Sequence, residues 1–267
     1  MFTIFLSLPY RKTVLVSTDC SVLKENLILN YGKYAHENEY CNADMYFTIT
    51  KSNSRYLFSF NDESYYTESP LSQVNRLLVS CDIFSDNILA LHGGAVEYKG
   101  EAYVFLAPTT CGKTTLTAYL SSVGLGYITD DCVIISKSDL KVHPHTTPLH
   151  LRDGGADILK KINLLPDYVS TLEDGKQFNR LVYTPANLVD TALPLKKIFF
   201  IERSDTKNEI LPMSTTERIT ELMKSPIVSY DITGEYIKLF INLSHADCAR
   251  LIYKDMEYVK EIIKNEH

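Results

Sequence analysis

The sequence AYVFLAPTTCGKTTLTAYLSSVGLGYITDD, residues 102–131, decides the fold. It opens with a short apolar run of strand-forming residues, Ala102–Leu106, continues through a polar loop, and becomes helical over Thr114–Val123. A strand, a loop and a helix in this order are the setting in which a loop can wrap a phosphate group. The backbone N–H groups of such a loop and the positive end of the helix dipole both favour an anion.

The loop resembles a Walker A motif, except that Ala107 stands where the first glycine is usual. A residue with a Cβ costs roughly 1–2 kcal/mol in the left-handed conformation, so we expect a negative φ at this position. Lys113 is expected to reach the terminal phosphates of ATP, and the Thr114 hydroxyl to hold Mg²⁺. The alternative is an ordinary helix start capped by a lysine. The predicted nucleotide-binding residues are Ala107, Pro108, Thr109, Thr110, Cys111, Gly112, Lys113, Thr114 and Thr115.

An acid pair, Asp130 and Asp131, is expected to lie close to this loop. A ten-residue helix carries the chain about 15 Å away from the loop. Gly124 and Gly126 allow a reversal, and an extended Leu125–Thr129 returns the chain by about 16 Å. The alternative is a solvated turn.

Two carboxylates at that place can hold Mg²⁺ and accept a proton from an attacking hydroxyl. We assign Asp130 as the catalytic base, and Asp131 with Thr114 as the metal ligands. The sequence does not orient the two carboxylates, so the reverse assignment stays open.

A hairpin is predicted immediately before the loop. Its strands are Leu89–Tyr98 and Glu101–Leu106, and the two residues between them, Lys99 and Gly100, suit a tight turn. Direct pairing across this turn places His92 opposite the first loop residue, with its imidazole beside the phosphates. The alternative is a buried structural histidine.

Three segments together resemble the catalytic domain of HPr kinase/phosphorylase: His92-Gly93, the loop 107–114, and Thr129-Asp130-Asp131. They resemble even more the HPr-kinase-related proteins of peptide-tailoring systems, which include lasso-peptide kinases. The resemblance is specific over residues 88–136 and diffuse beyond them. It implies an ATP-binding loop preceded by a histidine and followed by an acid pair, with catalytic roles for His92, Lys113, Thr114, Asp130 and Asp131. The glycine-rich second signature of true HPr kinases has no match, which argues against HPr as the acceptor.

The expected fold is α/β, an HPr-kinase-like P-loop core with a mixed sheet flanked by helices. An N-terminal β-rich subdomain precedes it, because residues 1–67 contain β-branched and aromatic runs separated by Asn, Asp and Ser. Apolar residues at helical spacing predict a linking helix over Leu71–Ile83. We therefore divide the chain into residues 1–84 and 85–267. The predicted N-terminal strands are Thr13–Ser17, Met45–Thr50 and Tyr56–Phe60.

A histidine-containing stretch, residues 142–150, follows the predicted strand Cys132–Ser136. Its two prolines favour irregular backbone, and it offers no Cys or acidic ligand at the spacing that zinc requires. We expect a loop that lines the acceptor site, with His145 or His150 contacting the substrate. A metal site that includes His143 is the alternative.

Residues 171–180, TLEDGKQFNR, are polar, contain glycine and lie between apolar segments. We interpret them as a mobile loop. Lys176 and Arg180 could then stabilise charge on the transferring phosphate, and Arg180 is counted among the catalytic candidates. The alternative is solvated surface charge.

The C-terminal part is predicted to contain one strand and several helices. Pro194–Ile201 is an apolar run typical of a buried strand. Ser214 and Glu217 form a capping-box pattern that starts a helix extending to Met223. Further helices are expected over Tyr236–Leu243 and Asp247–Lys264.

Composition excludes several classes of protein. Lys and Arg number 27 against 33 Asp and Glu, a net charge of −6, so no nucleic-acid partner is expected. The 6 cysteines are scattered and indicate neither a disulfide framework nor a zinc site. No apolar run is long enough for a membrane span, and the short apolar start lacks the features of a signal peptide. We expect a cytoplasmic protein, and homo-oligomerisation stays open.

The sequence therefore predicts a kinase that uses ATP and Mg²⁺. Three acceptors remain: a serine on a ribosomally made peptide, a serine on a folded protein, and a free small-molecule hydroxyl. The family resemblance favours the peptide. A nucleotide sensor without catalysis, in which binding only orders residues 171–180, is the rival hypothesis.

Overall fold

The computed structural model describes residues 1–7, 13–36, 43–60, 62–83, 88–161, 168–173, 176–227 and 234–266, which form a mixed α/β fold, as expected. The chain divides into two compact units. The first consists of Met1–Phe84 and Asp167–Val182, and the second of Ser85–Pro166 and Tyr183–His267. Sequence analysis assigned everything after residue 84 to the core, whereas the structure groups Asp167–Val182 with the N-terminal unit.

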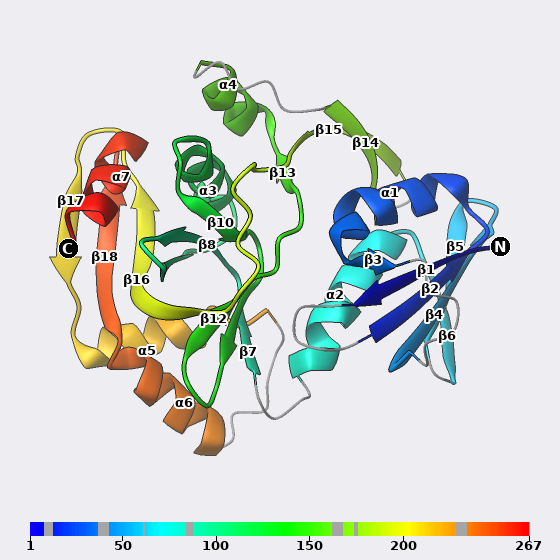
Figure 1. Cartoon of the computed structure of the whole chain (residues 1–267), viewed down its shortest axis with the longest axis horizontal. Helices are drawn as coiled ribbons and strands as arrows, with labels where there is room; N and C mark the ends of the chain where they lie inside the picture. The colour runs from blue at the N-terminus through cyan, green and yellow to red at the C-terminus, as the bar shows by residue number, and fades with distance from the viewer. Residues whose placement is uncertain are drawn as a thin grey trace. The chain divides into compact units, whose positions relative to one another are not determined.

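The N-terminal unit contains a sheet with two helices on one face (Figure 1). Its strand order is β3-β1-β2-β4-β5-β6; β2 and β4 pair in parallel, and the other neighbours are antiparallel. The bounds are β1 Phe2–Ser7, β2 Thr13–Thr18, α1 Ser21–Tyr31, a 3-10 turn η1 Gly32–Tyr34, β3 Ala35–His36, β4 Met45–Ser52, β5 Arg55–Phe60, β6 Glu63–Thr67 and α2 Pro70–Ile83.

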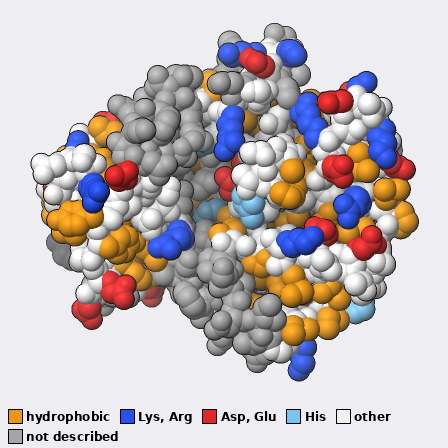
Figure 2. Space-filling model, turned by 180° about the vertical axis from the view of Figure 1, so that it is seen from behind, with side chains coloured by type: hydrophobic (Ala, Val, Ile, Leu, Met, Phe, Trp, Pro, Cys, Tyr) orange, Lys and Arg blue, Asp and Glu red, His pale blue; other side chains and the backbone are white. Residues whose placement is uncertain are grey.

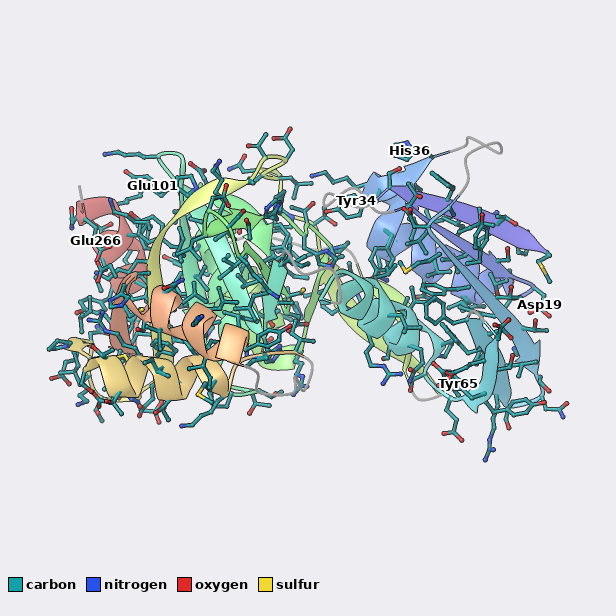
Figure 3. The ribbon with its side chains drawn as sticks, turned by 90° about the horizontal axis from the view of Figure 1, so that it is seen from below. Asp19, Tyr34, His36, Tyr65, Glu101 and Glu266 are labelled. Carbon is teal, nitrogen blue, oxygen red and sulfur yellow. The ribbon has the colours of Figure 1, made fainter. Side chains whose placement is uncertain are left out.

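Polar contacts fix the ends and the helix-covered face of this sheet. The Tyr65 hydroxyl on β6 donates to Gln73 on α2 at 3.2 Å, and Asp19, just after β2, accepts from the backbone N–H of Lys51 at 2.8 Å (Figure 3). Helix α2 was predicted within one residue of its observed start. Helix α1 was not predicted, because residues 1–67 were interpreted as strands. Its buried residues Leu23, Leu27 and Tyr31 recur every four positions, which is helical spacing.

The predicted mobile loop at residues 171–180 is wrong. Strands β14, Tyr168–Glu173, and β15, Lys176–Tyr183, pair here in antiparallel register. Asp174-Gly175 stands between the two strands, and this dipeptide is a strong hairpin-turn signal. The side chains of residues 168–180, including Lys176 and Arg180, lie outside the description.

The second unit is built on a larger mixed sheet of order β10-β8-β9-β16-β12-β11-β7, with β18 paired to β16 and β17 paired to β18. Strands β9, β16 and β18 are mutually parallel, so their carboxyl ends meet at one edge. The bounds are β7 Ile88–Leu91, β8 Gly93–Tyr98, β9 Glu101–Leu106, α3 Lys113–Ser122, β10 Gly126–Thr129, β11 Val133–Ser136, β12 Lys141–His143, β13 Leu149–Leu151, α4 Asp153–Lys161, β16 Leu193–Arg203, β17 Glu209–Pro212, α5 Thr215–Met223, α6 Gly234–Ser244, β18 Asp247–Tyr253 and α7 Met256–Asn265.

Helices cover both faces of this sheet. On one face α3 and α7 pack over buried residues such as Phe105 and Phe199, whose rings stack 5.9 Å apart. On the other face α5 and α6 pack over residues such as Val104 and Ile198. In Figure 1, α3 and α7 lie in the upper part of this unit, and α5 and α6 lie in its lower part.

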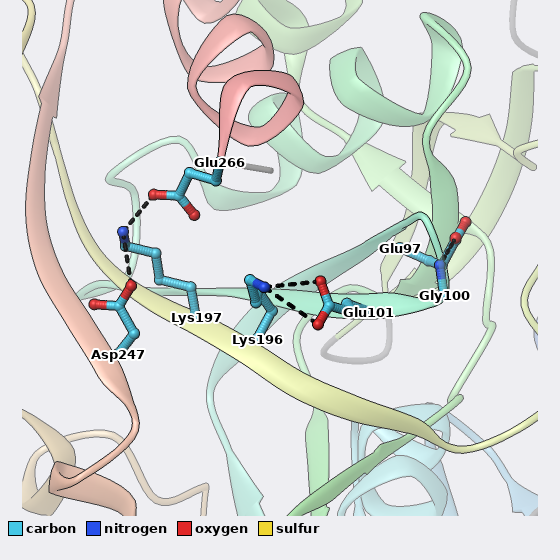
Figure 4. A network of polar contacts seen from close by, with 7 residues as sticks. All are labelled: Glu97, Gly100, Glu101, Lys196, Lys197, Asp247 and Glu266. Carbon is cyan, nitrogen blue, oxygen red and sulfur yellow. Dashed lines mark hydrogen bonds and ion pairs between the residues drawn. The ribbon is translucent and has the colours of Figure 1, made fainter.

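The prediction of one long helix over Asp247–Lys264 is wrong. The structure has strand β18 followed by helix α7. Apolar side chains on both faces of β18, for example Cys248 and Leu251, are buried, which favours a central parallel strand. The buried Lys197 on β16 holds both ends of this segment, because its ammonium group bonds Asp247 at 3.0 Å and also Glu266 (Figure 4).

Several local predictions are confirmed. The hairpin register pairs Tyr98 with Glu101 and continues to Gly93 and Leu106. The first strand of the hairpin begins at Gly93 rather than at Leu89, because Ile88–Leu91 forms a separate strand, β7, that pairs with β11. The predicted capping box is present, with Glu217 N–H donating to the Ser214 hydroxyl and the Glu217 carboxylate accepting from Ser214 N–H.

On the face drawn in Figure 2, basic and acidic side chains are interspersed rather than gathered in a field of one sign. No helix among the described residues is both long and apolar enough to cross a bilayer.

Candidate phosphate-binding site

The loop between β9 and α3 has the backbone conformation of a tight anion-binding turn. Gly112 has φ 87° and precedes the first residue of α3, where no side chain caps the helix. Thr110 has φ 72°, which is unusual for a β-branched residue and indicates stored backbone strain. Ala107 is not among the residues with positive φ, as its Cβ predicts. The open helix start therefore leaves N–H groups facing the loop, where an anion is favoured.

Lys113, which was expected to reach the terminal phosphates, is buried against the loop itself. It is only 5% exposed, and its ammonium group donates to the carbonyl oxygens of Ala107 at 2.9 Å and Pro108 at 3.0 Å. Burial lowers its pKa, against the opposing charges of Asp131 and Asp130. The loop carbonyls thus supply the acceptors that a phosphate group would otherwise provide.

The acid pair returns to the loop, as the lengths of the helix and strand predict. The Thr114 hydroxyl lies close enough to Asp130 to lower the pKa of that carboxyl group, and Lys113 lies within electrostatic range of both carboxylates. Asp130 is buried, and among the described residues its Oδ1 has no hydrogen-bond partner. Burial first, and the charge of Asp131 second, raise the pKa of Asp130 well above its ordinary value. The positive charge near the Asp130 carboxyl group is therefore too small to offset its burial and the charge of Asp131.

The turn that carries the acid pair is held from two sides. The buried Thr129 hydroxyl donates to the carbonyl oxygen of Cys132 at 2.7 Å. Asp131 is exposed and has φ 66°, so its backbone is in the left-handed region. Nδ1 of His92 lies 3.1 Å from the carbonyl oxygen of Asp131. Because a carbonyl only accepts, Nδ1 carries the hydrogen in this bond.

His92 is itself fixed by its backbone. It lies between β7 and β8, and its N–H donates to the carbonyl oxygen of Ser225 at 2.6 Å. The imidazole therefore contacts the acid-pair turn, which is consistent with the expectation that it lies at the phosphate end of the hairpin.

Helix α3 approaches β8 closely beneath the site. A Cβ added to Gly94 would lie 2.3 Å from the Thr117 hydroxyl oxygen and 3.5 Å from Oδ1 of Asp130. Only a glycine leaves room for α3 at this distance. The sequence pattern does not reveal that a glycine is required at position 94, because the requirement depends on where α3 crosses β8.

A metal ion would need more ligands than these side chains supply. Among the described residues, no group of three or more His, Cys, Asp or Glu could hold a metal. A hydroxyl and a carboxylate that lie close together, those of Thr114 and Asp130, fit Mg²⁺, which is commonly held by one or two carboxylates together with substrate phosphates. A cation there would also compensate the buried, underneutralised carboxylate.

The histidines downstream are partly in strands rather than in one loop. His143 ends β12, and His150 lies within β13. His145 is buried and bridges Thr129, and burial lowers its pKa to about 4, so its imidazole is neutral. It therefore lies next to the strand that carries the acid pair.

One residue beside the loop was missed. The hydroxyl of Tyr253, at the end of β18, lies 3.1 Å from where a Cβ of Gly112 would be. The signal that could have found it is the buried apolar run of β18, which is parallel to the strand before the loop. Because a helix was predicted over this run, Tyr253 was not recognised as a neighbour of the loop.

The comparisons with known proteins do not establish a family. No protein-family model and no curated protein matches the sequence. Among solved structures, the chain is similar to the Hpr(Ser) kinase/phosphatase from Coxiella burnetii, with 10% identity and a TM-score of 0.34, over 66% of this chain and 88% of that one. Function is therefore argued below from the geometry of the site.

Proposed function

We propose that this protein is a kinase that transfers the γ-phosphate of ATP to a hydroxyl group in the presence of Mg²⁺. The proximity of the Thr114 hydroxyl to the Asp130 carboxyl group, whose pKa it lowers, carries the proposal. It brings the hydroxyl that follows the loop lysine next to a buried carboxyl group. In P-loop phosphotransferases, a hydroxyl and a carboxylate so arranged hold the magnesium ion that bridges the terminal phosphates.

In this proposal the residues of the site have separate roles. The loop N–H groups cradle the phosphates, and Lys113 exchanges the carbonyl oxygens of Ala107 and Pro108 for phosphate oxygens. Asp130 and Thr114 would hold Mg²⁺, which would supply positive charge to the phosphates. This reverses the roles that we first assigned to the two aspartates, because Asp130 is the one that contacts Thr114.

Asp131 is then the base. Its carboxylate is exposed and adjoins the metal ligands, so it can meet an incoming hydroxyl. The acceptor oxygen forms a bond to the γ-phosphorus as the bond from phosphorus to the bridging oxygen breaks. ADP leaves with that electron pair, and the hydroxyl proton passes to Asp131. His92 positions the Asp131 peptide, and a contact from Arg180 to the phosphate stays a prediction.

For the acceptor, we propose a serine of a ribosomally made, lasso-type precursor peptide. The motif resemblance supports a peptide. So does β6, which ends the strand order of the N-terminal sheet and offers a backbone edge to an extended chain. A protein serine and free serine are the other acceptors.

The test uses γ-labelled ATP, Mg²⁺ and a serine-terminated peptide, with one added phosphate detected by mass. Asp131→Asn should keep ATP affinity and lose transfer by several orders of magnitude. Transfer to free serine alone would overturn the choice of acceptor. ATP binding without transfer to peptide, protein or free serine would favour a nucleotide sensor instead.

A further inference from the structure

Arg203 ends β16 at the sheet edge that carries the phosphate loop. Strand β16 pairs in parallel with β9, where Phe200 lies opposite Leu106, the last residue before the loop. Arg203 lies three residues beyond Phe200, so it is level with the loop rather than with the strand. Its side chain is exposed.

Arg203 shares the face of the sheet on which α3 starts. Alternate strand residues face the same side, and Phe199 and Ile201 both pack beneath α3 and α7. The Cα partner of Arg203 on β18 is Tyr253, whose hydroxyl contacts the Gly112 position. The positive charge of Arg203 also opposes the effect of burial, which raises the pKa of Tyr253 to about 12. Arg203 is thus a cation beside the loop.

The guanidinium group has no partner of its own in the described part of the chain: neither a hydrogen bond nor an ion pair engages it. Two acidic side chains of this unit are already engaged with other residues. Glu209 pairs with Lys207, and Glu257 accepts from Tyr119 and pairs with Lys260. An exposed, unpaired arginine at a phosphate loop is available to a ligand.

The order of the strands says which part of a nucleotide Arg203 would meet. The acid pair follows β10, which is two strands from β9 on one side, and Arg203 ends the neighbour of β9 on the other side. Strands are about 4.8 Å apart, so the two groups flank the loop. A nucleotide whose terminal phosphate reaches the acid pair would extend its nucleoside toward Arg203.

We propose that Arg203 binds the nucleoside end of the nucleotide, an inference that rests on the proposed function. A planar guanidinium can stack on a purine and hydrogen-bond its edge. The acid pair and Lys113 would act on the phosphates, whereas Arg203 would recognise the base. The loop would then bind phosphate of any origin, and Arg203 would add preference for a nucleotide.

The test compares ATP with inorganic tripolyphosphate, by calorimetry on the full chain at fixed Mg²⁺. Arg203→Ala should weaken ATP binding about tenfold and leave tripolyphosphate affinity unchanged. Arg203→Lys keeps the positive charge but removes the planar guanidinium group, so it should also weaken ATP binding. Lys238→Ala, which removes an exposed charge on α6 on the opposite face of the sheet, is the control and should change neither.

Two outcomes would overturn the inference. Equal loss of ATP and tripolyphosphate affinity would make Arg203 a phosphate contact, and unchanged ATP affinity would remove it from the site. The failure of the proposed function is distinguishable, because it would appear in the wild-type protein itself, as no binding of either ligand or as ATP binding without phosphate transfer. Thermal unfolding of each variant shows whether the fold is kept.

Discussion

The Thr114 hydroxyl lies close enough to the Asp130 side chain to lower the pKa of that carboxyl group, although 16 positions separate the two residues in the chain. Helix α3 and strand β10 carry the chain out and back between them. The pair joins the loop to the acid turn, so the predictions below begin with it.

Asp130→Asn should stabilise the free protein at neutral pH. The pKa of Asp130 is raised in the folded state, mainly by burial, so the ionised group costs free energy above that pKa. The cost disappears as the pH falls toward about 4, the usual pKa of an unfolded aspartate. We expect the Asp130→Asn variant to unfold at a higher urea concentration than the wild type at pH 8. This difference between the two urea midpoints should shrink toward pH 4.

Asp139→Asn is the control, because it should destabilise the protein at neutral pH, whereas Asp130→Asn should stabilise it. A hydrogen bond from Ser136 lowers the pKa of Asp139 to about 2, so its ionised form stabilises the fold above the unfolded pKa. That contribution is lost as the pH falls toward 2. A urea midpoint difference for Asp130→Asn that does not change with pH would contradict the assignment of a raised pKa.

His92→Ala should reduce phosphate transfer about tenfold and leave ATP affinity unchanged. The imidazole donates to the Asp131 carbonyl, and one such bond contributes about 1 kcal/mol. His92→Asn keeps a donor and should recover part of the rate. If His92→Ala lowers ATP affinity as much as transfer, the histidine contacts the nucleotide and does not position the turn.

Gly94→Ala should destabilise the protein by about 1–3 kcal/mol, because the new methyl group collides with the Thr117 hydroxyl. Adding Thr117→Ala removes the colliding atom and should restore most of the loss in urea unfolding. Adding Thr117→Val keeps a branched side chain and should not. Additive effects of Gly94→Ala and Thr117→Ala would show that this contact does not set the spacing.

Short-range patterns predicted the parts of the fold that local chemistry determines. The two-residue turn at Lys99-Gly100 fixed the hairpin register, and Ser214 with Glu217 fixed the start of α5. The order of strand, loop and helix around residues 107–112 was predicted for the same reason, because its strand, glycine and lysine are adjacent in sequence.

Elements that depend on the environment were harder to predict. Asp247–Tyr253 is a strand because it lies between β16 and β17, and an apolar run alone does not separate this from a helix. The different burial of Asp130 and Asp131 also depended on the turn that carries them. Its backbone at Asp131 is left-handed, which leaves one carboxylate buried and the other exposed.

Nucleotide binding through Lys113 is the central claim, and calorimetry of Mg·ATP with the wild type and Lys113→Met tests it most directly. Methionine fills the buried space without the charge, and urea unfolding checks that the variant is folded. We predict that the wild type binds and that the variant binds about 100-fold more weakly, since charged hydrogen bonds to phosphate are lost. Equal affinity of the two folded proteins, or no binding by the wild type, would contradict the account.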